Sequence, residues 1–136
     1  MINFKEYIKQ KKVIKCEPDL QKSKSLIKMS QNNFSSIKKI PLTNQYSSII
    51  FTQIYECLRQ IIEAIALKEG FKVYSHEAYT HYLKDKKEIS IAEKFDRYRK
   101  LRNGINYYGK AVTTQITKEA IYQINKIIEK LKDKYV

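Results

Sequence analysis

Hydrophobic residues recur every three or four positions along most of this 136-residue chain, a spacing that predicts helices rather than strands. The clearest pattern lies within residues 44–69, where one apolar face is formed by Tyr46, Ile50, Ile54, Leu58, Ile61 and Ile65. Thr43 or Asn44 is the expected N-cap of this helix, and Gly70 its expected end, because these residue types favour those positions. We therefore predict one long, buried, central helix.

Prolines and capping residues divide the rest of the chain. Pro18 suits a helical first turn and Pro41 disfavours helical geometry before it, which predicts a helix over residues 18–39. Before that helix, residues 1–16 are expected to form a short helix or an arm.

Three further helices are expected after the central one. Residues 71–74 are predicted to link it to a helix that Ser75 caps and that runs to about residue 85. A helix over about residues 90–109 follows, and the last begins with Thr113 or Thr114 as its cap. Together these elements predict an all-α, up-and-down bundle of four to six helices in a single domain, residues 1–136.

The net charge of the chain predicts the class of molecule that it binds. The formal net charge is +13 and the pI is about 9.6, which favours a polyanion: nucleic acid first, then an acidic protein or an anionic membrane surface. A lysine-rich proteome would give the same balance. The apolar stretch over residues 48–67 carries Glu56, Arg59 and Glu63, so no membrane span is expected.

Cysteine and histidine usage points to the cytoplasm and away from bound cofactors. Cys16 and Cys57 have neither metal-type spacing nor a disulfide framework, which fits a reducing cytoplasm. His76 and His81 are five residues apart and would not share a helical face, so no metal site is expected. His76 is instead expected to pack or hydrogen-bond at the start of its helix. No glycine-rich phosphate loop occurs, and no cofactor is predicted.

Arginine is concentrated in one short stretch. The chain has only four arginines, and three of them, Arg97, Arg99 and Arg102, lie within six residues. The guanidinium group is planar and permanently charged, and its fork matches the oxygens of a phosphate. An apolar stripe of the same helix contains Ile91, Phe95, Tyr98, Leu101, Ile105, Tyr108 and Val112. A neighbouring polar sector is expected to hold Arg99, Arg102, Asn103 and Asn106.

Part of this stretch resembles a motif of a known protein family. Arg102-Asn103, followed by three residues and an aromatic, resembles the core motif of the HEPN superfamily, whose members are small helical bundles and include many metal-independent ribonucleases and toxins. The segment Tyr55–Ala78 is similar to the matching helix pair of archaeal HEPN proteins. The resemblance covers roughly residue 19 to the end of the chain. Where the family has a histidine, this sequence has Tyr107 or Tyr108.

The resemblance implies a site and partners. It implies catalytic roles for Arg102, Asn103 and Tyr107, with RNA contacts from Arg97, Arg99, Asn106, Tyr108 and Lys110. It also implies a homodimer that forms the cleft from two protomers, and a nucleotidyltransferase antitoxin as a partner. Tyr107 would stack on a base or donate its hydroxyl group to a phosphate; the alternative is a solvent-exposed or dimer-contacting tyrosine.

Three functions remain open at this stage. The first is an endoribonuclease or toxin in which arginines stabilise the charge on the reacting phosphate. The second is an inactive HEPN module that binds nucleic acid or nucleotide. The third is a structural interaction protein.

Overall fold

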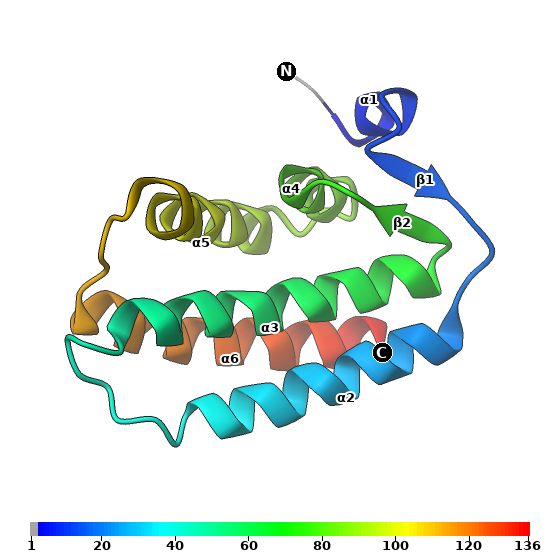
Figure 1. Cartoon of the computed structure of the whole chain (residues 1–136). Helices are drawn as coiled ribbons and strands as arrows, with labels where there is room; N and C mark the ends of the chain where they lie inside the picture. The colour runs from blue at the N-terminus through cyan, green and yellow to red at the C-terminus, as the bar shows by residue number, and fades with distance from the viewer. Residues whose placement is uncertain (1–2) are drawn as a thin grey trace.

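The computed structural model describes residues 3–136. Within this range six helices and two short strands follow one another as α1 (Phe4–Lys9), β1 (Val13–Lys15), α2 (Leu20–Ile37), α3 (Ser47–Lys68), β2 (Phe71–Val73), α4 (His76–Asp85), α5 (Ile89–Tyr108) and α6 (Thr114–Tyr135) (Figure 1). The predicted all-α helical bundle is confirmed.

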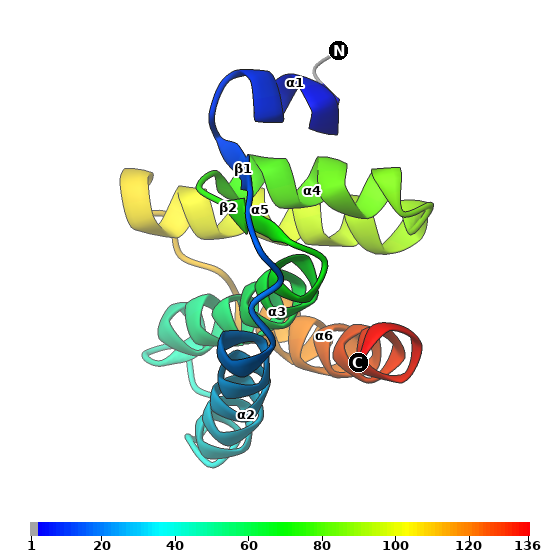
Figure 2. The same ribbon diagram turned by 90° about the vertical axis from the view of Figure 1, so that its right-hand side faces the viewer.

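Helix α3 is the centre of the core. Its apolar residues continue around most of the helix, and Ile54, Leu58 and Ile61 are fully buried. Helices α2 and α6 pack along α3, and α4 and α5 pack against each other as a pair. Figure 2 shows the α4–α5 pair crossing the layer formed by α2, α3 and α6. Since α3 also contacts α4 and α5, it connects the two layers.

The start of α3 differs from the prediction. The helix begins at Ser47 rather than after a cap at Thr43 or Asn44, and Tyr46 occupies the N-cap position without a side-chain hydrogen bond. Tertiary contacts replace the cap. The Ser47 and Thr117 hydroxyl groups lie 2.8 Å apart in the core and join α3 to α6. The capping prediction is therefore wrong because local propensity was overridden by helix packing.

A small sheet occurs where a link was predicted. Residues 71–74 contain strand β2, which pairs antiparallel with β1 from the N-terminal segment. The backbone N–H of Cys16 donates to the carbonyl oxygen of Gly70 at 2.8 Å, and Gly70 has a φ of +90°. Of the expected short helix or arm over residues 1–16, residues 3–16 contain helix α1 and strand β1, and residues 1–2 lie outside the described range.

The predicted boundaries around the arginine-rich helix agree with the structure. Ser75 precedes α4, and Gly109 ends α5 in the left-handed conformation with φ +62°. Thr113 caps α6, its hydroxyl oxygen accepting a hydrogen bond from the N–H of Ile116 at 3.2 Å. The linker between α5 and α6 is fixed as well, because the N–H of Val112 donates to Ser48 Oγ at 3.1 Å.

No helix within residues 3–136 combines the length and the apolar character that crossing a bilayer would require.

Candidate functional site

Arg102 projects from α5 toward the core. It follows Tyr98 by four residues and Phe95 by seven, so the three share one side of the helix, and both aromatic rings are buried. Its guanidinium carbon lies 5.9 Å from the centre of the buried Tyr55 ring on α3. The sequence placed Arg102 in a polar sector next to the apolar stripe, and in the structure it lies beside the Phe95 and Tyr98 part of that stripe. Its side chain is half-buried at the inner edge of α5.

The apolar stripe also ends earlier than predicted. Ile91, Phe95 and Tyr98 are buried, but Tyr108 is 75% exposed. The last turn of α5 extends beyond the packed part of the bundle and ends at Gly109, so no other helix covers Tyr108. Val112 is buried, but it lies in the linker after the helix.

A histidine from another helix lies beside Arg102. His76, the first residue of α4, has its Nδ1 atom 2.9 Å from the hydroxyl oxygen of Tyr55. The two rings also stack, with their centres 5.9 Å apart and their planes 30° apart. We call Tyr55, His76 and Arg102 the Arg102 cluster; α3, α4 and α5 each contribute one member. The prediction that His76 packs or hydrogen-bonds at the start of its helix is confirmed.

The surroundings keep the two titratable members of the cluster uncharged. Burial, followed by the positive charges of Arg102 and Arg59, lowers the pKa of His76 to about 4. Burial also raises the pKa of Tyr55 above its ordinary value. At neutral pH the imidazole and the phenol are therefore both neutral. Because the phenol can donate or accept the shared hydrogen bond, the other ring nitrogen of His76, Nε2, can accept or carry a proton.

Arg102 differs from the arginines near it in having no acidic partner. Arg59 is held by two glutamates of α3, and Arg99 is held by Asp96 of α5 at 2.8 Å. Within residues 3–136, Arg102 forms no ion pair; its Nη1 donates to Asn103 Oδ1 at 3.2 Å. A half-buried charge without a counter-ion favours binding of an anion.

The residues predicted from the motif divide between two sides of α5. Asn103 and Tyr107 lie near Arg102, whose guanidinium carbon is 5.9 Å from the Tyr107 ring centre. Tyr107 is 69% exposed and Asn106 is exposed beside it. Arg99 is close in sequence, but its guanidinium group is occupied by Asp96.

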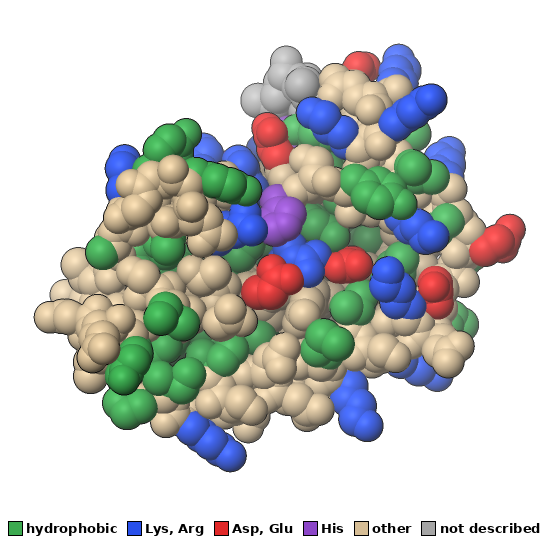
Figure 3. Space-filling view, in the orientation of Figure 1, with side chains coloured by type: hydrophobic (Ala, Val, Ile, Leu, Met, Phe, Trp, Pro, Cys, Tyr) green, Lys and Arg blue, Asp and Glu red, His purple; other side chains and the backbone are tan. Residues whose placement is uncertain are grey.

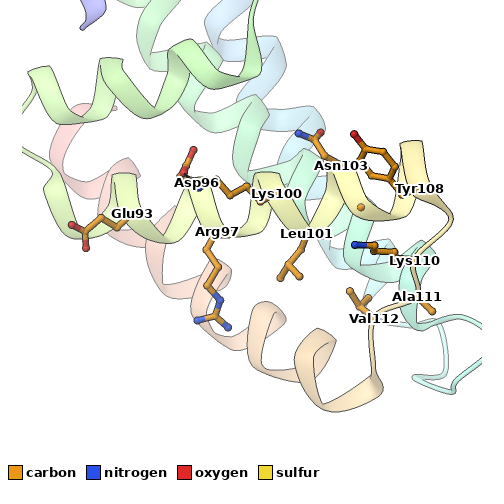
Figure 4. A pocket seen from close by; sticks show the side chains of 11 residues that line it. Glu93, Asp96, Arg97, Lys100, Leu101, Asn103, Tyr108, Lys110, Ala111 and Val112 are labelled. Carbon is orange, nitrogen blue, oxygen red and sulfur yellow. Dashed lines mark ion pairs between the residues drawn. The ribbon is translucent and has the colours of Figure 1, made fainter. Parts of the chain in front are cut away.

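The remaining three predicted residues line a different surface. Arg97, Tyr108 and Lys110 line a groove of about 730 Å³ formed by α5 and the linker that follows it (Figure 4). Arg97 lies 3.7 Å from Glu119 of α6. Lys110 has its amino group 6.0 Å from the centre of the Tyr108 ring. This surface is separate from the Arg102 cluster except at Asn103, which lines the groove and also contacts Arg102.

Sequence reasoning missed the part played by His76. The family motif predicts the second functional residue after Arg102, whereas His76 lies 26 residues before it. The only local signal was its position directly after the capping residue Ser75, which predicted a contact but not its partner. On the face drawn in Figure 3, a histidine side chain lies in a hollow among basic and acidic groups. Within residues 3–136 no group of three or more His, Cys, Asp or Glu side chains is placed to hold a metal ion.

Comparisons of the chain with protein-family models, with curated proteins and with solved structures found no match.

Proposed function

We propose that this chain is a HEPN-like RNA-binding protein that acts as a metal-independent endoribonuclease, in the manner of a toxin. The observation that supports the proposal most is Arg102: within residues 3–136 it is a half-buried arginine without a carboxylate partner, and its charge acts on the neutral His76. This pair supplies a cation for a phosphate and a proton acceptor, both placed against Tyr55. The Arg102-Asn103 resemblance and the net charge of +13 support the same class of ligand.

The chemistry follows from the position of these groups. The 2′-hydroxyl group of a ribose attacks the adjacent phosphorus while Nε2 of His76 removes its proton. The bond from phosphorus to the 5′ oxygen breaks, and a proton from water neutralises that leaving oxygen. Arg102 stabilises the negative charge that develops on the non-bridging oxygens. The products are a 2′,3′-cyclic phosphate and a 5′-hydroxyl end.

Binding of RNA would raise the pKa of His76, the proposed general base. In the free protein, the pKa of His76 is about 4, partly because Arg102 is close. A phosphate beside Arg102 brings negative charge toward the imidazole and raises its pKa toward neutrality, where a general base is most effective. His76 is therefore weakly basic when the site is empty and more basic when RNA is present.

The second candidate is a module that binds RNA without cutting it. The observation in its favour is the same low pKa, because a base with a pKa of about 4 accepts a proton poorly. This candidate keeps the phosphate contact of Arg102 and omits the proton transfer.

The proposal also covers the oligomeric state, the protein partner and the cellular compartment. Tyr107 is exposed near the end of α5, where a second copy would cover it in a homodimer. A nucleotidyltransferase antitoxin is the proposed partner. Two free cysteines and an RNA substrate fit the cytoplasm.

Substitutions of Arg102 separate the two candidates. For the enzyme, Arg102→Ala should lower single-turnover cleavage of RNA by about a hundredfold or more while RNA affinity changes only a few-fold. Arg102→Lys keeps the charge but loses the fork, so it should restore affinity better than rate. Lys130→Ala removes an exposed lysine of α6 and serves as the control. If wild-type protein binds RNA but shows no cleavage for Arg102→Ala to reduce, the binding module is the function.

A further inference from the structure

We propose that the groove formed by α5 and the linker to α6 binds the nucleotide next to the scissile phosphate, with its base on Tyr108 and its phosphate on Lys110. The inference rests on the proposed RNA-binding function and extends it to a second surface. With a volume of about 730 Å³, the groove falls within the usual range for small-ligand sites and has room for a nucleotide.

The groove has an apolar floor and a stacking surface. Leu101, Gly104 and Val112 line it, and Figure 4 shows Leu101 and Val112 between α5 and α6. Tyr108 lies at its edge with 75% of its surface exposed, so the ring is free to stack on another aromatic ring. Every nucleobase has a flat π-face, and stacking on tyrosine needs no particular base. The groove thus fits a base of single-stranded RNA without selecting its identity.

Charge within the groove is uneven, which gives a bound nucleotide an orientation. Lys110 forms no ion pair within the described residues, whereas Lys100 is paired with Asp96 at 3.1 Å. Glu93 lines the groove along with Asp96. A phosphate is therefore attracted toward Lys110 and repelled from the acidic residues. The linker leads from this end into the first turn of α6, whose dipole adds positive potential.

Lys110, at the positively charged end of the groove, is hydrogen-bonded through its backbone. The backbone N–H of Lys110 donates to the carbonyl oxygen of Gly104 at 3.0 Å. The Lys110 side chain packs over Gly104, where a Cβ atom would lie 3.7 Å from Lys110 Cδ. A Cβ atom there would meet the lysine at ordinary van der Waals distance, so the two residues are in simple contact. The backbone hydrogen bond fixes where Lys110 leaves the helix end before any ligand binds.

Asn103 connects the groove with the Arg102 cluster. Its side chain lines the groove, and its Oδ1 accepts a hydrogen bond from Arg102 at 3.2 Å. An RNA strand whose phosphate binds Arg102 would pass Asn103 and reach Tyr108 around the last turns of α5. The groove is thus placed to take a nucleotide directly beside the reacting one.

Tyr122 and Lys126 of α6 provide a matched control pair. Tyr122 is 59% exposed, and the Lys126 amino group lies 4.4 Å from its ring centre, but neither residue lines the groove. The probe is a short, fluorescein-labelled, single-stranded RNA with 2′-O-methyl groups, which bind but cannot be cut by 2′-hydroxyl attack. Fluorescence anisotropy then measures affinity over a range of salt concentrations.

The groove inference predicts different losses for its two residues. Tyr108→Ala should weaken binding about tenfold, as expected for the loss of one stacked base. Lys110→Gln should reduce the dependence of log affinity on log salt by about one unit. Tyr122→Ala and Lys126→Gln should stay within about twofold of wild type. Equal effects at the two tyrosines would overturn the inference, and so would a change of Tyr108→Ala from dimer to monomer in sedimentation.

The outcome also separates this inference from the proposed function. If Arg102→Ala stops cleavage while Tyr108→Ala binds like wild type, the groove inference fails and the ribonuclease stands. If wild-type protein cuts no RNA but Tyr108→Ala weakens binding, the ribonuclease fails and the groove stands. Failure of the wild type to bind the probe at low salt overturns both.

Discussion

Arg102 is half-buried among residues that do not neutralise its positive charge. Most of its neighbours are aromatic or neutral, and its one side-chain hydrogen bond is to an amide oxygen. The positive charge is therefore neither neutralised nor fully hydrated. The same charge depresses the pKa of His76, so the two residues are electrostatically coupled in the free protein.

This coupling predicts the response of His76 to the loss of the arginine. Arg102→Ala removes a positive charge that opposes protonation of the imidazole, so the pKa of His76 should rise from about 4 toward its ordinary value of 6.5. The shift will be partial because burial, the larger cause, remains. An NMR titration of the imidazole C–H resonances measures it directly.

His81 provides an internal reference for that titration. Its pKa is lowered by burial and Lys84, and its ring packs against Tyr7 rather than in the Arg102 cluster. Its midpoint should be the same in wild type and in Arg102→Ala. An unchanged His76 midpoint, with His81 also unchanged, would show that the guanidinium group does not act on the imidazole.

At the scale of elements, α5 contains one glycine within the helix and is ended by another. Gly109 ends the helix in the left-handed conformation, whereas Gly104 lies within the helix and contacts the Lys110 side chain. A third glycine, Gly70, lies between α3 and β2. Its φ is +90°, and an added Cβ atom would lie 2.8 Å from the carbonyl oxygen of Cys16.

The stability of the fold should respond with opposite signs to alanine at Gly104 and at Gly70. Gly104→Ala should stabilise the fold by up to about 1 kcal/mol, because alanine favours a helix interior and its methyl group meets only ordinary contacts. Gly70→Ala should destabilise it by more than about 1 kcal/mol, because the conformation is strained and the backbone of Cys16 must move. Urea denaturation of the two variants beside wild type measures both changes. Destabilisation by Gly104→Ala comparable to that of Gly70→Ala would contradict the assignment of their roles.

Elements that are long and periodic were predictable, and short ones were not. The helices from residue 18 onward could be predicted because their apolar faces repeat over several turns and their ends carry proline, glycine or a capping residue. Strands β1 and β2 contain three residues each and are stable only through pairing across a large sequence separation. The start of α3 was missed for a related reason: Ser47 bonds to Thr117 of a distant helix, which no local preference encodes.

At the scale of the whole molecule, the formal net charge of +13 sets the expected behaviour toward polyanions. If several lysines contact phosphates beside Arg102, binding to RNA releases a matching number of counter-ions. Affinity should then fall roughly a thousandfold between about 50 and 200 mM salt. Filter binding or anisotropy across that range measures the slope. Binding that is insensitive to salt would remove the electrostatic basis of the proposal.

The candidate site itself is a property of the tertiary structure. The sequence predicted Arg102 and Asn103 as functional, and it placed them on the correct helix. It placed Arg102 in a polar sector beside the apolar stripe, but it extended that stripe to Tyr108, which is exposed in the structure. The approach of His76 depends on how the α4–α5 pair crosses α3, which a linear pattern does not contain.

The most direct test of the ribonuclease proposal is cleavage of mixed single-stranded RNA by wild-type protein at neutral pH in the presence of a chelator, with the product ends identified. The expected result is cutting that leaves 2′,3′-cyclic phosphate and 5′-hydroxyl ends. His76→Gln and Arg102→Ala should each lower the rate by about a hundredfold or more, while Lys130→Ala cuts like wild type. Uncut RNA, or cutting that persists unchanged in both cluster variants, would contradict the assignment of the Arg102 cluster as a ribonuclease centre.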